Sequence, residues 1–174
     1  REFGEATAIL TGDALLTRAF QVLAELPRVA DAIRLEILRE ISRAVGTVNG
    51  MIGGQVVDLE SEGKPIKPET LEYIHRSKTG ALLTACTRCG ALAATANDGE
   101  LQALTEYGKK VGLAFQIIDD VLDVRSDIAT LGKTSGKDAA TNKSTYPALF
   151  GLEKSRKEAA RLTKKAHEAI KPFG

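Results

Sequence analysis

The sequence predicts an all-α fold, on three observations. Apolar residues recur at helical spacing along almost the whole chain, and short turns rich in glycine and proline interrupt them. No run of β-branched residues alternates as a half-buried strand requires. Hydrophobic residues make up 43% of the 174 residues, which is enough for a real core. We therefore expect residues 1–174 to form one all-helical domain.

Five helices are expected, and their ends carry recognisable signals. Pro27 ends the first helix, because proline disfavours helical backbone in the residue before it. A Gly63-Lys64-Pro65 turn follows the second helix. Pro68 opens the third, in the first turn, where its missing N–H is not needed. These three helices are expected over residues 4–26, 29–59 and 69–94.

The last two helices flank a loop of about residues 126–140. Asn97 and Asp98 cap the start of the fourth helix, because their side-chain oxygens can accept hydrogen bonds from free backbone N–H groups. Pro172 stops the fifth helix. These helices are expected over residues 98–125 and 142–171.

The charge balance argues against several classes of protein. Lys and Arg number 24 and Asp and Glu 23, so the net charge of +1 lacks the basic excess of a nucleic-acid-binding protein. No apolar run approaches the roughly 20 residues of a membrane span, and neither end resembles a signal peptide. We expect a soluble cytoplasmic protein with no nucleic-acid partner, in which any anionic ligand is bound locally.

The most informative segment is Phe115–Asp123, an apolar stretch that contains four polar side chains: Gln116, Asp119, Asp120 and Asp123. At about 100° per helical residue, they fall on one face within an arc of roughly 100°. The apolar neighbours predict that this face is buried, and buried carboxylates are costly unless they are paired or bind a cation. Oxygen ligands favour a hard cation such as Mg²⁺.

Lysines follow this acidic helix. Lys133, Lys137 and Lys143 stand in a segment that also contains glycines, and lysine together with accessible backbone N–H groups suits phosphate. A Walker A loop is excluded, because no glycine stands five residues before Gly132 or Gly136. The segment is either a phosphate-binding loop or a solvated surface loop.

Two further polar pairs interrupt otherwise apolar helices. Gln55 and Asp58 are three residues apart and share a helix face, and Lys78 directly precedes Thr79. Each pair is either a helix surface or a hydrogen-bonded contact between helices, or both line one cavity with the acidic helix.

Glycines lie on the acidic helix as well. Gly108 and Gly112 precede Gln116 at intervals of four residues, on the same side as the aspartates. Each costs up to about 1 kcal/mol against alanine in a helix interior. They either allow two helices to pack closely or leave room for a ligand.

The cysteines and histidines do not make a metal site in the sequence. Cys86 and Cys89 lack the further ligands that zinc requires, so we expect them to pack on a helix. His75 and His167 are isolated and are expected at exposed helix positions, although His75 could approach a site through the residues that follow it.

Residue chemistry alone predicts a helical bundle that binds magnesium opposite a set of lysines, with a phosphate-rich ligand between them. Magnesium commonly uses one or two carboxylates together with substrate phosphates and waters. This chemistry does not separate phosphoryl transfer from cleavage of a carbon–diphosphate bond.

Phe115–Asp123 resembles the second aspartate-rich motif of the trans-polyprenyl diphosphate synthases, the family of farnesyl and geranylgeranyl diphosphate synthases. Other blocks resemble signatures of that family in the same order and spacing. They are Phe3–Ala6, Gly12–Leu15, Gly54–Asp58, His75–Thr79, Gly132–Lys133 and Lys143–Pro147. The resemblance covers nearly the whole chain and implies the isoprenoid synthase helical bundle.

The resemblance also implies a role for each candidate residue. Mg²⁺ would be the cofactor, bound by Asp119, Asp120 and Asp123. The residues implied to contact the allylic diphosphate are Lys78, Thr79, Gln116, Lys133 and Lys143. Lys78, Asp119 and Lys133 would be catalytic, and Gln55 and Asp58 would line the reaction cavity.

The reaction implied by the resemblance is prenyl transfer. The carbon–oxygen bond of an allylic diphosphate breaks, isopentenyl diphosphate attacks the resulting cation, and a proton is lost. The product would be a short-chain polyprenyl diphosphate, with farnesyl and geranylgeranyl products not distinguished. A homodimer is expected from the family.

The chain also departs from the family pattern. The family's first aspartate-rich motif lies upstream of the block at Phe3–Ala6, as do the residues that bind isopentenyl diphosphate. The family's last helix would also follow Pro172-Phe173-Gly174. The resemblance therefore implies the C-terminal part of a synthase, a helical bundle incomplete at both ends, which alone would be inactive. Two alternatives stay open: a non-catalytic subunit or inactive fragment of such a synthase, and a terpene cyclase-like enzyme of the same fold.

Overall fold

The computed structural model describes residues 2–131 and 145–174, and these residues are helical without any strand. The predicted all-α fold is confirmed. The helices are α1 (Glu5–Ala24), α2 (Asp31–Val45), α3 (Met51–Ser61), α4 (Pro68–His75), α5 (Ala81–Ala93), α6 (Asp98–Leu131), α7 (Tyr146–Phe150) and α8 (Leu152–Ile170). A π-helical turn, η1 (Arg76–Gly80), joins α4 to α5, and a short 3₁₀ turn, η2 (Lys171–Phe173), follows α8.

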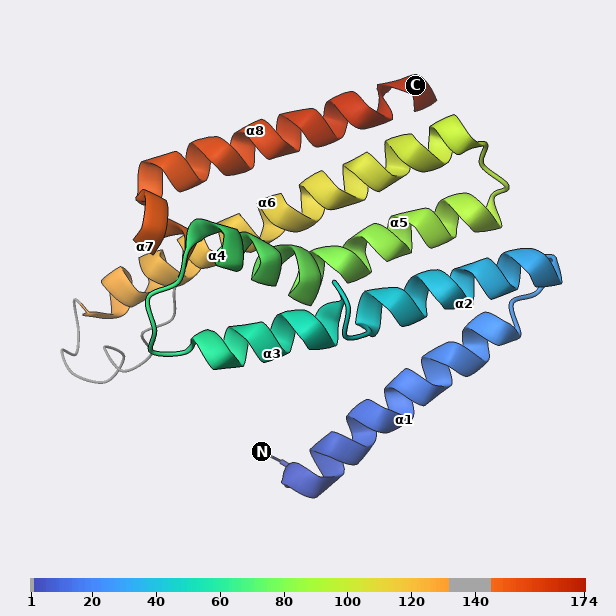
Figure 1. Ribbon diagram of the computed structural model, residues 1–174, viewed down its shortest axis with the longest axis horizontal. Helices are drawn as coiled ribbons and strands as arrows, with labels where there is room; N and C mark the ends of the chain where they lie inside the picture. Colours follow the sequence, from blue (N-terminus) through green and yellow to red (C-terminus); the bar gives the residue numbers. More distant parts are fainter. Residues whose placement is uncertain (1, 132–144) are drawn as a thin grey trace.

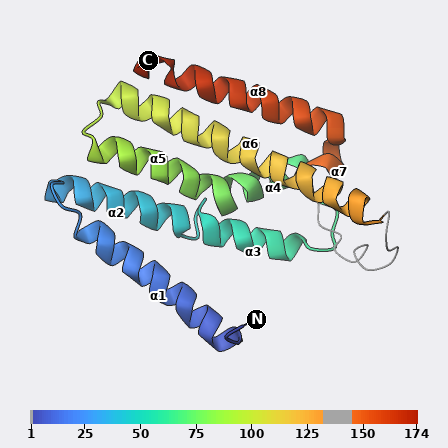
Figure 2. The same cartoon turned by 180° about the vertical axis from the view of Figure 1, so that it is seen from behind.

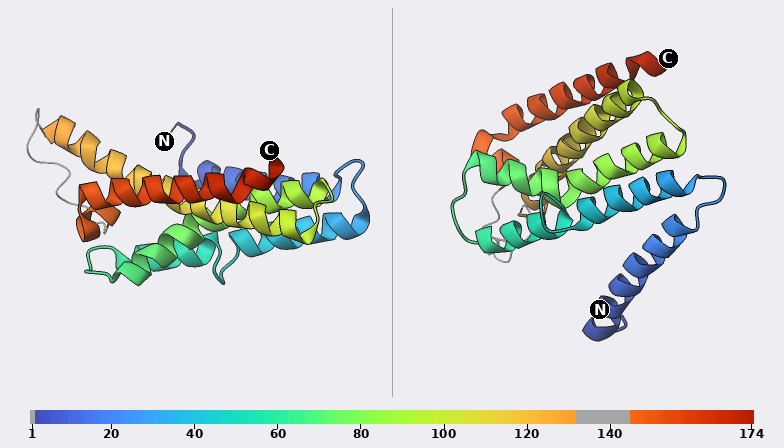
Figure 3. Two further views of the ribbon diagram at one scale, coloured as in Figure 1. Left: turned by 90° about the horizontal axis from the view of Figure 1, so that it is seen from above. Right: turned by 45° about the vertical axis from the view of Figure 1, so that its right-hand side comes forward.

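The helices form a layer. Figures 1 and 2 show α8, α6, α5 and α2 side by side in that order, with α3 extending the line of α2. Both α4 and α7 contact α6. Figure 3 shows that α1 leans away from the layer and stays near α2 only at the turn that joins the two helices.

The helix predicted over 29–59 is in fact two helices, which is a correction. The chain turns between Val45 and Met51, where Asn49 has a positive φ of 55°. A Cβ atom at Gly50 would lie 2.4 Å from the carbonyl oxygen of Arg43, so the backbone folds back on itself more closely than any side chain allows. Gly46 and Gly50 were the signal in the sequence for this break. The prediction gave more weight to the apolar spacing on either side of them, which is that of one continuous helix.

Three other boundaries differ from prediction. The helix predicted over 69–94 is interrupted by η1, and α6 continues to Leu131, so the start of the predicted 126–140 loop is helical. The helix predicted over 142–171 is divided at Gly151, whose φ of 83° is left-handed and ends α7. The first helix, predicted over 4–26, is confirmed within two residues at each end.

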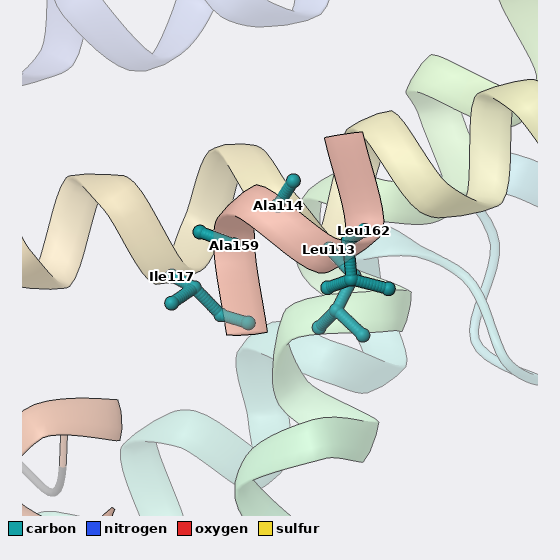
Figure 4. Packing of buried hydrophobic residues seen from close by; sticks show 5 residues of the cluster. All are labelled: Leu113, Ala114, Ile117, Ala159 and Leu162. Atoms are coloured by element: carbon teal, nitrogen blue, oxygen red, sulfur yellow. The ribbon is translucent and has the colours of Figure 1, made fainter. Parts of the chain in front are cut away.

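The core lies between α6 and α8. Leu113, Ala114 and Ile117 of α6 pack against Ala159 and Leu162 of α8, as Figure 4 shows. On α8 the buried residues recur every three or four positions, which is the pattern of an amphipathic helix.

The two glycines on α6 serve close packing. A Cβ at Gly112 would lie 2.8 Å from the Cα of Gly80, and a Cβ at Gly108 would lie 2.6 Å from Oγ1 of Thr87 and 2.8 Å from the Cα of Thr84. The backbone of α6 therefore touches η1 and α5 directly. Of the two interpretations left open by the sequence, close packing is confirmed, because protein atoms already fill the space.

Large apolar side chains are exposed on several elements, among them α1, α3 and α6. On α1 no residue is buried, and Leu10 and Leu15 are each 67% exposed. On α6, Phe115, Ile118 and Leu122 are exposed by 40% or more. Exposed apolar surface of this extent marks a face that contacts another part of a protein.

Cys86 and Cys89 both lie on α5 and neither forms a disulfide; the expected packing holds for Cys89, which is partly buried, but is wrong for Cys86, which is exposed. Burial raises the pKa of the Cys89 thiol to about 11, so this thiol is protonated and unreactive at neutral pH. Among the helices of residues 2–131 and 145–174, none combines the length and the apolar character that a transmembrane segment needs.

Candidate functional site

Gln55, Asp58, Lys78 and Thr79 come together although α3 and η1 are separated along the chain. The contact depends on Gly54, because a Cβ there would lie 2.4 Å from the backbone nitrogen of Lys78. Nζ of Lys78 donates a hydrogen bond of 2.7 Å to Oδ2 of Asp58, and both side chains are partly shielded from solvent. Of the alternatives that the sequence left open, the two polar pairs therefore meet in a contact between α3 and η1.

A cavity of about 340 Å³ opens beside this ion pair. Its lining residues are Met51, Ile52, Gln55 and Val56 of α3 with Lys78 and Thr79 of η1. The walls are largely apolar, and one ammonium, one hydroxyl and one amide are available at its edge. Such a cavity can bind a ligand with an apolar body and an anionic head group.

The π-turn is what presents Lys78 and Thr79 there. A π-turn takes in one more residue than an α-helical turn, and such turns occur frequently at functional sites. Ser77 and Gly80 of this turn are buried, whereas Lys78 and Thr79 are only partly buried. Ser77 and Gly80 therefore pack the turn against the rest of the protein, and Lys78 and Thr79 line the cavity.

The acidic face of α6 is only partly as predicted. Asp120 is buried, at 6% exposure, but Asp119 and Asp123 are exposed, and so are their apolar neighbours Phe115 and Ile118. The prediction of a fully buried face is wrong for these residues, because α6 packs along a narrower stripe that includes Ile117, Asp120 and Val121. Gln116 lies between the two environments and is partly buried.

Asp120 is paired inside the protein. The backbone N–H of Tyr146 donates a 2.8 Å hydrogen bond to Oδ2 of Asp120, and Nε2 of His75 lies 3.3 Å from the same oxygen. The His75 ring also stacks on the Tyr146 ring, with centroids 6.3 Å apart. The buried carboxyl group thus accepts one hydrogen bond from α7 and is approached by a ring nitrogen from α4.

His75 was expected to be exposed, and that prediction is wrong. Only 4% of His75 is exposed. With Leu71 and Ile74 it forms a stripe of buried residues at spacings of three and four along α4. That spacing was present in the sequence and could have identified His75 as an inward-facing residue. His167, in contrast, is exposed as expected.

No group of three or more His, Cys, Asp or Glu side chains gathers to hold a metal within the described ranges. Asp119 and Asp123 are four residues apart and lie on the same exposed side of α6. Magnesium needs only one or two carboxylates when phosphates and waters supply the other ligands, so these two residues fit such an ion. Lys133 and Lys143 lie outside the described residues.

A larger cavity of about 550 Å³ lies between α2 and α5, and none of the predicted site residues lines it. Four cationic side chains line it, and three of them have anionic partners: Arg88 bonds to Glu40, Arg76 to Glu72 and Lys109 to Glu106. The candidate site is the smaller cavity, because Gln55, Lys78 and Thr79 from the sequence motifs line it.

Comparison with known proteins gives a consistent picture. Residues 1–171 match the sequence family described as polyprenyl synthetase. The chain is 50% identical over 173 residues to the farnesyl diphosphate synthase of Escherichia coli strain K12, covering 98% of this chain and 58% of that protein. It is 45% identical over 173 residues to the geranylgeranyl diphosphate synthase of Cyanophora paradoxa, covering 98% and 57% respectively.

Solved structures match over the same extent. An FPP/GFPP synthase from Zymomonas mobilis aligns with a TM-score of 0.86 at 35% identity, over 99% of this chain and 57% of that one. A geranyltransferase from Helicobacter pylori, crystallised with magnesium and isoprenyl diphosphate, aligns with a TM-score of 0.81 at 34% identity, over 99% and 56%. The chain thus spans less than three fifths of the length of each of these four proteins.

Proposed function

This chain belongs to the polyprenyl synthetase family, and we propose that it supplies the diphosphate-binding part of a prenyltransferase active site. Its substrates would be an allylic diphosphate and isopentenyl diphosphate, and its product a short-chain polyprenyl diphosphate. The observation that carries the proposal is the 340 Å³ cavity with Lys78, Thr79 and Gln55 at its edge. The resemblance predicted from the sequence motifs is confirmed at the level of family and fold.

Lys78 is the proposed anchor for the allylic diphosphate. A lysine ammonium acts as a compact point charge for phosphate, and the Thr79 hydroxyl beside it can donate a further hydrogen bond. Asp58 holds Nζ of Lys78 at 2.7 Å, and so keeps the ammonium beside the cavity when no substrate is bound. As the carbon–oxygen bond breaks, the electron pair leaves with the diphosphate, and a fixed positive charge there lowers the energy of the transition state.

The apolar part of the cavity would protect the reaction. Ile52 and Val56 belong to its wall, and they offer the allylic cation no nucleophile. Exclusion of water favours attack by the double bond of isopentenyl diphosphate over hydrolysis. Loss of a proton from the carbon next to the new cation then regenerates a double bond and completes the addition of one isoprene unit.

Magnesium is the proposed cofactor. Asp119 and Asp123 would hold it from the exposed side of α6, whereas Asp120 is buried and its Oδ2 faces His75 and the Tyr146 N–H. The ion would supply Lewis-acid stabilisation of the charge that develops on the departing diphosphate. The roles of Gln116, Lys133 and Lys143 as diphosphate contacts stay predictions, as do the cytoplasmic location and the homodimer.

Replacement of Asp119 by asparagine tests the proposal. Assayed in a chain that also carries the family's first aspartate-rich motif, the variant should form polyprenyl diphosphate from isopentenyl diphosphate and an allylic diphosphate about a hundredfold to ten-thousandfold more slowly than the unchanged protein, since a metal's charge stabilisation is worth several kcal/mol. Because Asp119 is exposed, the unfolding midpoint should stay unchanged. Asp98→Asn, at the other end of α6, is the matched control and should retain full turnover.

Three results would contradict the proposal in different ways. Unchanged turnover in Asp119→Asn would remove the metal-binding role of that residue. Cyclised products formed without consumption of isopentenyl diphosphate would indicate a terpene cyclase. The third result concerns the protein without substitutions. If it has no turnover of its own but alters the product of an added synthase, it is a regulatory subunit.

A further inference from the structure

The buried contact between His75, Asp120 and Tyr146 lies outside the cavity, and the reaction described above makes no use of it. His75 and Asp120 are 4% and 6% exposed, although both side chains are polar and could have been solvated elsewhere. Burial of a histidine and a carboxylate together is costly unless the pair has good geometry and further hydrogen bonds. Such a contact therefore calls for an explanation beyond packing.

The geometry fixes how the His75 ring is oriented. Nε2 lies 3.3 Å from Oδ2 of Asp120, so this ring nitrogen, and not Nδ1, faces the carboxyl group. Nδ1 is buried and has no hydrogen-bond partner among the described residues. The ring is thus directed by one polar interaction only, its contact with Asp120, and by stacking on Tyr146.

Asp120 in turn fixes one turn of α6. Its Oδ2 accepts a hydrogen bond from the Tyr146 N–H of α7 and lies beside His75 of α4. The carboxyl group therefore contacts two other elements from α6. Asp119 is its neighbour in the chain and Asp123 lies about one helical turn further on. Any rotation of this turn about the helix axis would move both exposed carboxylates together.

We propose that His75 is a positioning residue for the metal-binding carboxylates: with the Tyr146 amide it locks Asp120, and so fixes the turn of α6 that presents Asp119 and Asp123. This inference rests on the proposed function, because it presumes that the exposed carboxylates bind a divalent cation. Residues that orient metal ligands from behind commonly change metal affinity about 10-fold to 100-fold when they are replaced.

Two amide replacements of His75 separate the positioning role from packing. In His75→Gln the amide nitrogen can reach the place of Nε2, whereas in His75→Asn the shorter side chain ends near the place of Nδ1. Both variants are polar and smaller than histidine, so they share most of the packing cost. Thr105→Val serves as a control, because it removes another buried polar contact of α6, with Arg88, farther from the acidic residues.

The measurement is binding of Mn²⁺, a paramagnetic substitute for Mg²⁺, followed by electron paramagnetic resonance in the presence of inorganic pyrophosphate. We expect His75→Asn to weaken Mn²⁺ binding about tenfold or more, and His75→Gln and Thr105→Val to stay within about threefold of the unchanged protein. Each variant is first shown to be folded by its circular dichroism and unfolding curve.

Asp119→Asn, measured in the same titration, keeps the two proposals distinguishable. If Asp119→Asn loses Mn²⁺ binding while folded His75→Asn and His75→Gln both bind like the unchanged protein, His75 has no positioning role and the proposed function stands. If His75→Gln is weakened as much as His75→Asn, the Nε2 contact is not what matters and the inference is overturned. If Asp119→Asn binds Mn²⁺ normally, the metal site itself, and with it the proposed function, is wrong.

Discussion

Two neighbouring isoleucines show how differently the two sides of α6 are used. Ile117 is fully buried against α8, at 0% exposure, whereas Ile118 is 40% exposed on the side that also carries Asp119 and Asp123. The inner side therefore stabilises the fold, and the outer side is left for a ligand or another part of the protein. Successive residues of a helix differ by about 100° in direction, so a residue that packs in the core and a residue that faces outward can be direct neighbours in the chain.

The largest effect on stability should come from truncating the inner isoleucine. Ile117→Ala should lower the free energy of unfolding by about 2–5 kcal/mol, because it leaves a cavity in the core between α6 and α8. Ile118→Ala is the matched variant on the outer side and should cost less than half as much. Urea denaturation followed by circular dichroism measures both. Equal losses would mean that another part of the protein covers the outer side.

A smaller effect is expected where the inner side of α6 meets η1. Gly112→Ala should cost about 1–3 kcal/mol, because the new methyl group would lie 2.8 Å from the Cα of Gly80 and force the two backbones apart. Gly90→Ala on α5 is the matched change in open space, and it should stabilise the helix by up to about 1 kcal/mol. Thermal unfolding of the two variants in parallel gives the difference, and shifts of the same sign would refute close packing at Gly112.

The smallest effect concerns the polar contact that joins α2 and α5 to the inner side of α6. Arg88 bonds to Glu40 and to the Thr105 hydroxyl, and its hydrogen bond holds the pKa of the Glu40 carboxyl below the usual range. Because the folded-state pKa is lowered, the ion pair stabilises the protein above about pH 4.3, the ordinary pKa of a glutamate. That contribution is lost as the pH falls through the lower folded-state value.

Glu40→Gln therefore has a pH-dependent effect. It should cost less than about 1 kcal/mol near neutral pH, and the difference from the unchanged protein should shrink as the pH is lowered toward 3. Urea unfolding at a series of pH values measures it. Glu106→Gln is the comparison within a single helix, since hydrogen bonds from Lys110 and Lys109 of α6 lower the pKa of that carboxyl. A cost for Glu40→Gln that stays constant with pH would exclude the ion pair as its source.

Much of the fold was predictable because its signals are local. Apolar spacing predicted which segments are helical, and Pro68 opens α4 as expected. The errors concern where the helices begin and end. At Gly50 the backbone folds back on Arg43, and at Gly151 one left-handed residue ends a helix that apolar spacing alone would continue.

The site was predictable by residue type more than by arrangement. The sequence singled out Gln55, Asp58, Lys78 and Thr79 without showing that Lys78 pairs with Asp58, since that contact depends on how α3 packs on η1. It missed His75, whose partner lies 45 residues away in the chain. Pairing between distant residues follows from packing, which the spacing of residues along one helix does not encode.

The π-turn has a consequence for insertions and deletions in this stretch of the chain. Loss of a single residue from Arg76–Gly80 would let the backbone follow a regular α-helix, and α5 would rotate by about 100° relative to α4. Either His75 would then turn away from Asp120, or Lys78 from Asp58. The number of residues in the turn is therefore more constrained than their identity, so a substitution here can be tolerated where a deletion cannot.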